Sequence, residues 1–140
     1  MKKYHGNNTM KNYHIPQPKN IRNFNGSFAW IDHRLMRNGF INIMTHHDMG
    51  LYLFLVLAAD KNGVSFYRKE KICEAVSLDY NQFEIAKDRL INMKLIAFEG
   101  YSMLSPNGYY QILPIKNARH GIADVDGRDK YRLITDDHLA

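Results

Sequence analysis

The sequence predicts a mainly α-helical domain with a small antiparallel β-hairpin. Three observations lead to this fold class. Apolar residues recur at helical spacing in several segments, strand-forming residues gather in short runs, and the hairpin signal Asn107-Gly108 separates the last two runs. With 140 residues and 45% hydrophobic content, the chain is long enough to bury one core and to carry tails.

The first strong helix is expected to begin after Thr45, a favourable N-cap with Asp48 at the reciprocal position of a capping box. Apolar residues run almost all round this helix, which indicates a central buried element. A turn at residues 60–63 follows it. Residues 64–67 are β-branched or aromatic in three of four positions, and they predict a short strand.

Two more helices are expected next. Residues 68–77 form a short helix whose Ile72, Cys73 and Val76 point inward. The following helix starts at the N-cap Asp79, with Gln82 placed to complete a second capping box. Its buried stripe has the three- and four-residue spacing of one helix face and comprises Phe83, Ala86, Leu90 and Met93.

Two strands at residues 96–99 and 109–113, turning at 106–108, complete the predicted domain. Upstream, a short helix over 32–37 is expected to stop near Gly39, and Trp30, Leu35 and Phe40 are expected to anchor it to the core. We therefore divide the chain into a basic extended arm (1–26), a short helical segment packing on the core (27–44), the main domain (45–115) and a polar C-terminal tail (116–140).

The order of these elements resembles a winged helix-turn-helix domain. The resemblance covers roughly residues 45–115 and is carried by the segments THHDMGLYLFLVLAAD, GVSFY, RKEKICEAVS, LDYNQFEIAKDRLINMK, LIAFEG and YYQILPI. It is similar to the modules of plasmid and phage replication proteins and of small transcription regulators. The stretches SFAWIDHRLMRNGF, LYLFLVLAAD and GVSFY also resemble short uncharacterised bacterial proteins found near mobile elements, a likeness that implies no particular activity.

The resemblance implies that the third helix enters the major groove of DNA and that the hairpin, or wing, reaches the backbone. The leading hypothesis is a non-enzymatic DNA-binding protein, a regulator or replication accessory of a bacterium, phage or plasmid, which as a homodimer would bind a two-fold site. The residues expected to contact base edges are Asn81, Gln82 and Asn92. The cations expected to contact phosphate are Lys87, Arg89, Arg68, Lys69, Lys71, Arg34 and Arg37.

The alternative hypothesis is a winged helix used for protein contact, as an adaptor in a replication or transposition assembly or as a phage-borne inhibitor of a host defence complex. The third helix is nearly neutral, and residues 101–108 contain no Lys or Arg. The predicted contact residues are Glu84, Ile85, Asp88, Tyr101, Met103 and Leu104. Two plainer interpretations stay open: the helix face is merely solvated, and Met103 or Leu104 folds back onto the core.

The charge pattern places the basic residues outside the predicted domain. The formal charge is +5, but residues 1–37 hold seven Lys/Arg against one acid, whereas residues 38–99 hold seven against eight. The arm, with Tyr4, Tyr13 and Phe24 among its cations, is either a nucleic-acid-tracking segment or a solvated tail.

Several other function classes lack their sequence signals. The single cysteine, Cys73, excludes an intrachain disulfide and fits a cytoplasmic protein. The adjacent pair His46-His47 lacks metal-ligand spacing, and residues 124–129 only partly match a calcium loop. The sequence has no phosphate-binding loop and no nucleophile motif. The longest apolar run, residues 51–59, is too short to span a bilayer. We therefore expect no enzyme activity, metal, cofactor or membrane contact.

Overall fold

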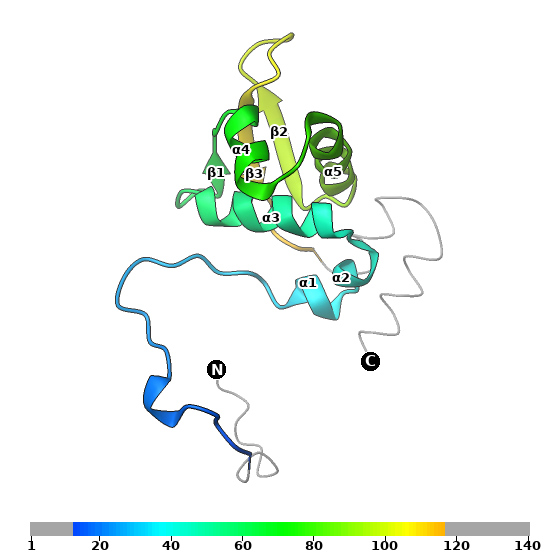
Figure 1. Cartoon of the computed structure of the whole chain (residues 1–140). Helices are drawn as coiled ribbons and strands as arrows, with labels where there is room; N and C mark the ends of the chain where they lie inside the picture. Colours follow the sequence, from blue (N-terminus) through cyan, green and yellow to red (C-terminus); the bar gives the residue numbers. More distant parts are fainter. Residues whose placement is uncertain (1–12, 117–140) are drawn as a thin grey trace.

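Three helices and a three-stranded sheet form the body of the protein in the computed structural model, which describes residues 13–116 (Figure 1). The helices are α3 (His46–Ala58), α4 (Lys69–Val76) and α5 (Tyr80–Asn92), and the strands are β1 (Val64–Ser65), β2 (Ile96–Gly100) and β3 (Gly108–Ile112). Before them lie the 3-10 helix η2 (Pro18–Asn20) and the short helices α1 (Arg34–Arg37) and α2 (Phe40–Ile43). The predicted class, mainly helical with antiparallel strands, is confirmed.

Both predicted capping boxes are present. Thr45 Oγ1 accepts a hydrogen bond from Asp48 N at 3.1 Å, and Asp48 Oδ2 accepts from Thr45 N at 2.9 Å. At the start of α5, Asp79 Oδ1 accepts from Gln82 N at 2.7 Å and Gln82 Oε1 accepts from Asp79 N at 3.0 Å. Each N-cap of this kind contributes about 1 kcal/mol of stability, which explains why both helices begin where local sequence predicts.

The sheet has the order β1-β3-β2, and both strand pairs are antiparallel. Strand alternation turns Tyr110 into the core and Tyr109 outward. The predicted turn at Asn107-Gly108 is wrong, because Gly108 already belongs to β3 and pairs with Gly100. The connection is the longer loop 101–107. Gly108 is required for close strand approach, since a Cβ there would collide with the carbonyl oxygen of Glu99.

The core lies where α3, α4, α5 and the sheet meet. Its most completely buried large side chains are Tyr110, Phe83, Leu51, Leu55, Ile72, Leu90, Leu95 and Ile96. The prediction that Cys73 points inward is confirmed, and burial raises the pKa of its thiol. The expectation that α3 is a central buried helix is confirmed only for the face that carries Leu51, Tyr52, Leu55 and Val56, because Leu53 and Leu57 on its other side are exposed.

Upstream of the domain, only part of the predicted packing is present. Leu35 and Phe40 are buried, as predicted, and Gly39 between α1 and α2 has a φ of 88°, a left-handed conformation that glycine adopts without strain. Trp30 is not an anchor, since 75% of its surface is exposed. The reason is local: residues 21–32 form neither helix nor strand, so no regular element holds the indole against the core.

Among residues 13–116, no helix is both long and apolar enough to cross a membrane. The same part of the chain contains no cluster of three His, Cys, Asp or Glu side chains arranged to hold a metal ion. The partial calcium-loop match at 124–129 lies outside the described residues.

Candidate interaction surface

The outward side of α5 is polar and has one apolar residue near its middle. Asn81, Asp88 and Asn92 are exposed, and Ile85 exposes 53% of its surface. Gln82, predicted to read a base, is half-buried and uses its side-chain carbonyl in the capping box with Asp79. Two of the three predicted base readers, Asn81 and Asn92, therefore face solvent.

The lysines beside α5 form ion pairs with a neighbouring carboxylate. Lys69 Nζ lies 2.7 Å from Glu84 Oε2, and Lys87 Nζ lies 3.4 Å from Glu84 Oε1. Lys87 Nζ also lies 4.2 Å from the centre of the Phe98 ring, in cation–π geometry. Only 17% of the Lys69 side chain and 12% of the Lys87 side chain are exposed, so neither ammonium is presented openly to a phosphate.

Glu84 is held as an anion by these contacts. Partial burial by itself would raise its pKa, but the hydrogen bond from Lys69 and the charges of Lys87 and Lys69 outweigh that effect and leave the pKa below its ordinary value. Glu84 was predicted as part of an acidic contact face. The structure shows that its charge is largely balanced within the protein.

Arg89 lies in a second internal pair. Its Nε donates to Asp48 Oδ2 at 2.7 Å, and its Nη2 donates to the carbonyl oxygen of Ile43 at 2.6 Å. Asp48 is completely buried. Arg89 was predicted to contact phosphate, but in the structure its guanidinium is engaged in joining α5 to Ile43 and to the start of α3. The sequence signal is indirect: an acid inside an apolar helix requires a partner.

The remaining predicted cations lie on α4 and in the segment before the domain. Arg68 and Lys71 are exposed, and Arg68 Nη2 lies 3.4 Å from Glu70 Oε2 in an exposed ion pair. Arg34 forms a 2.6 Å ion pair with Asp32, whose hydrogen bonds from Arg34 lower its pKa, while Arg37 is exposed. Of the seven cations predicted to contact phosphate, four are exposed, namely Arg68, Lys71, Arg37 and Arg34, and Arg34 is held in the short ion pair with Asp32.

The loop between β2 and β3 presents two apolar side chains to solvent. Met103 is 98% exposed and Leu104 is 94% exposed. The interpretation that one of them folds back onto the core is wrong. Both side chains stand at the tip of the hairpin, which projects beyond the helices in Figure 1. Residues 101–107 form this hairpin tip.

The base of the hairpin tip is well ordered by hydrogen bonds. Asn107 Oδ1 accepts from the backbone N of Lys69 at 2.8 Å, and Tyr101 N donates to the carbonyl oxygen of Asn107 at 3.0 Å. Ser105 Oγ donates to the same carbonyl at 2.8 Å. Because Lys69 also pairs with Glu84 of α5, the start of α4 links the hairpin tip to α5.

An aromatic group lies at the base of the hairpin tip, and only Tyr101 of its three members was predicted as a contact residue. Tyr101, Tyr109 and Phe66 are each about half exposed, with ring centres 5.0 Å apart for Tyr101 and Tyr109 and 6.0 Å for Phe66 and Tyr109. The hydroxyl of Tyr101 donates to the carbonyl oxygen of Phe66 at 3.3 Å. Strand alternation at Tyr109 and Tyr110 is the signal that places one ring outside and one inside.

Comparison of the chain with protein-family models, with curated proteins and with solved structures found no match.

Proposed function

We propose that this protein is a non-enzymatic module of the winged-helix type that binds another protein through its hairpin tip and α5. The helix–strand–helix–helix–hairpin order supports the winged-helix assignment. The observation that carries the binding proposal is the nearly complete exposure of two adjacent apolar side chains, Met103 and Leu104, on a loop whose base is fixed by hydrogen bonds.

Exposed apolar side chains on an ordered support favour a protein partner over DNA. A partner that covers Met103 and Leu104 gains apolar burial at small ordering cost, because the loop base is already in place. Tyr101 and Tyr109 add aromatic rings of the kind enriched in protein interfaces. A wing that grips phosphate needs cations, and residues 101–108 contain none.

The test is site-specific photo-crosslinking in cells that express the full chain. A photoreactive amino acid at Met103 is compared with the same amino acid at Glu74, an exposed position on α4. We expect a discrete adduct from position 103 that resists nuclease and is digested by protease, and none from position 74. Ile85→Asp should lower its yield. An adduct removed by nuclease, or equal adducts from both positions, would contradict the proposal.

DNA binding is the second candidate, because Arg68, Lys71 and Arg37 are exposed together with Lys19 and Arg22. Binding of random duplex is measured by fluorescence anisotropy at two salt concentrations. The protein-contact proposal expects affinity no tighter than the non-specific range of ~10⁻⁴–10⁻⁶ M at physiological salt. Tighter binding with a steep salt dependence, weakened by Arg68→Ala with Lys71→Ala, would make DNA the primary partner. Glu74→Ala is the matched control on the same helix.

A further inference from the structure

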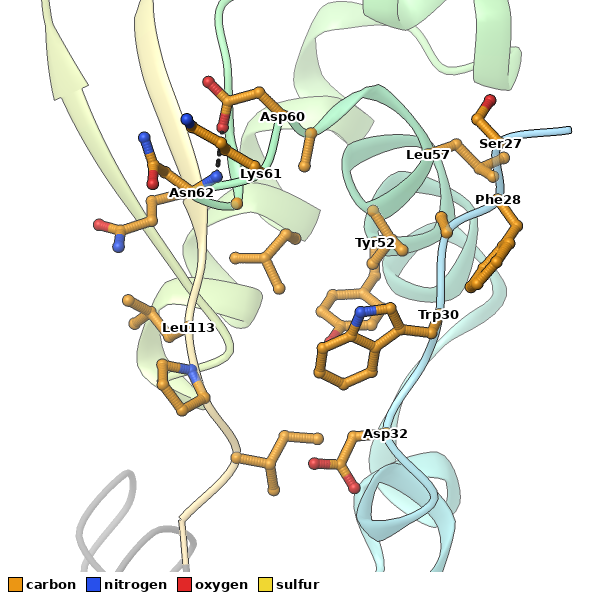
Figure 2. Close-up of a pocket in the computed structure, with 18 residues that line it drawn as sticks. Ser27, Phe28, Trp30, Asp32, Tyr52, Leu57, Asp60, Lys61, Asn62 and Leu113 are labelled. Carbon is orange, nitrogen blue, oxygen red and sulfur yellow. Dashed lines mark hydrogen bonds between the residues drawn. The ribbon is translucent and has the colours of Figure 1, made fainter. Parts of the chain in front are cut away.

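A hollow of about 760 Å³ lies between the segment 27–32 and the body of the protein (Figure 2). One wall is α3, with Tyr52, Val56 and Leu57, and another is the chain that continues from β3, with Leu113. Figure 2 shows Trp30 lying near Tyr52, across the hollow from Leu113. The walls combine polar and apolar side chains in nearly equal measure, and the space is large enough to receive several side chains.

The segment that borders the hollow exposes its own apolar side chains. Ile21, Phe24 and Phe28 are each more than 60% exposed, and the rings of Phe24 and Phe28 lie 5.1 Å apart. Leu57, on the α3 wall, is 65% exposed. Figure 1 shows the chain before α1 passing along α3 and then curving away from it towards the short helix η2. One chain thus presents both a hollow with an apolar side on α3 and an exposed apolar segment, residues 21–28, here called the strip.

We propose that residues 21–28 of a second copy of this chain fill the hollow, and that the exchange is mutual. In a two-fold symmetric dimer both protomers use the same surface, so the strip of each protomer occupies the hollow of the other. Residues 21–28 form neither helix nor strand and bend at Gly26, and when fully stretched they would span ~25 Å, long enough to cross a hollow of this size.

The area involved matches a stable dimer. A buried aromatic side chain hides ~150–250 Å². With Phe24, Phe28 and Ile21 about two thirds exposed, one strip can bury ~400 Å² and cover a similar area of the opposite wall. Two such exchanges bury ~1,600 Å² in total, which is the size of a specific protein interface.

Charge is compatible with this occupant. Residues 13–31 contain Lys19 and Arg22 but no acid. The hollow is lined by Asp32, Asp60 and Lys61, two acids against one base. Hydrogen bonds from the backbone N–H groups of Val64 and Asn62 lower the pKa of Asp60, so it is an anion at neutral pH. The basic strip of one protomer therefore meets a lining with one excess negative charge on the other.

The full chain is examined by sedimentation equilibrium over a wide concentration range. We expect a mass twice the 16.4 kDa of one chain, and a single-chain mass for both the hollow variant Leu57→Asp and the strip variant Ile21→Ser with Phe24→Ser, since Phe28 also lines the hollow of its own chain. These side chains are exposed in one chain, so the variants should fold. Met103→Ser with Leu104→Ser is the matched control and should remain dimeric. A single-chain mass for the wild type, or dimers in both strip and hollow variants, would overturn the proposal.

Trp30 supplies a second readout, because it lines the hollow and is the only tryptophan of the chain. We expect its fluorescence to shift to shorter wavelength as the wild-type concentration rises, and to stay constant in Leu57→Asp. A short-wavelength emission that is independent of concentration at single-chain mass would mean that the chain fills its own hollow, which also overturns the proposal. Failure of this dimer leaves the crosslinking test at Met103 unaffected, since that site lies on the hairpin tip.

Discussion

The ion pair between Arg89 and Asp48 gives the sharpest prediction about stability. Replacing Arg89 by Met keeps most of the side-chain volume but removes both hydrogen bonds of the guanidinium, at 2.7 Å and 2.6 Å. Asp48 is completely buried, and its Oδ1 has no hydrogen-bond partner among the described residues. After the substitution the buried carboxylate keeps only the backbone N–H of Thr45.

The expected loss follows from these contacts. Removing one partner of a buried ion pair costs ~3–5 kcal/mol, because the other charge is left uncompensated. Since 35% of the Arg89 side chain is exposed and Asp48 retains one hydrogen bond, we place Arg89→Met at the lower end, ~3 kcal/mol. In a chain of this length that corresponds to a fall in Tm of about 10 °C.

The measurement is urea unfolding together with a thermal scan, with Arg37→Met as the matched control. Arg37 is exposed, and its substitution should change the free energy of unfolding by less than ~0.5 kcal/mol. Combining Arg89→Met with Asp48→Asn should cost less than the sum of the single changes, with a coupling of ~2 kcal/mol. Equal stabilities of Arg89→Met and Arg37→Met would refute the structural role assigned to Arg89.

Two further predictions concern titrating groups. Because the pKa of Glu84 is lowered in the folded protein, its contribution to stability is present above the ordinary carboxyl pKa of 4.5 and is lost as the pH falls below it. Glu84→Gln should therefore reduce the fall in Tm between pH 5 and pH 3. Asp88→Asn, an exposed control on α5, should leave that fall unchanged. An equal dependence of Tm on pH in Glu84→Gln and in the wild type would contradict the lowered pKa of Glu84. Burial raises the pKa of Tyr110 above its ordinary value of 10, so stability present below pH 10 should decline above it. Its buried hydroxyl has no hydrogen-bond partner among the described residues, so Tyr110→Phe should leave neutral stability unchanged or raise it by ~1 kcal/mol and should keep more of it at pH 11. Tyr109→Phe, on the outer face, is the control, and a loss of more than ~2 kcal/mol in Tyr110→Phe at pH 7 would show that the hydroxyl is bonded.

Local sequence signals predicted the elements well. The helix starts at Thr45 and Asp79 follow from side chains that bond their own backbone three residues away, which needs no tertiary information. The inward stripe of α5 follows in the same way from residue spacing. The prediction of a turn at Asn107-Gly108 was wrong, because Gly108 lies in β3. There the glycine allows close contact with Glu99 and Gly100 of β2.

The candidate surface depended on partners distant in sequence. Arg89 and Asp48 are 41 residues apart, and a basic residue on α5 has the same local pattern whether it faces solvent or a buried acid. Lys69 likewise reaches Glu84 from another helix. Trp30 failed as an anchor because aromatic character predicts burial only where a regular element directs the ring inward.

The sequence by itself determined the order of helices and strands, the capped helix starts, the basic character of the arm and the lack of cations in the hairpin tip. These properties depend on composition and on contacts within a few residues. Only the tertiary structure decided which charges are paired and which apolar side chains stay exposed, namely Met103 and Leu104 at the hairpin tip and Leu57 at the hollow. Pairing and exposure depend on surfaces assembled from distant segments, and local periodicity carries no information about them.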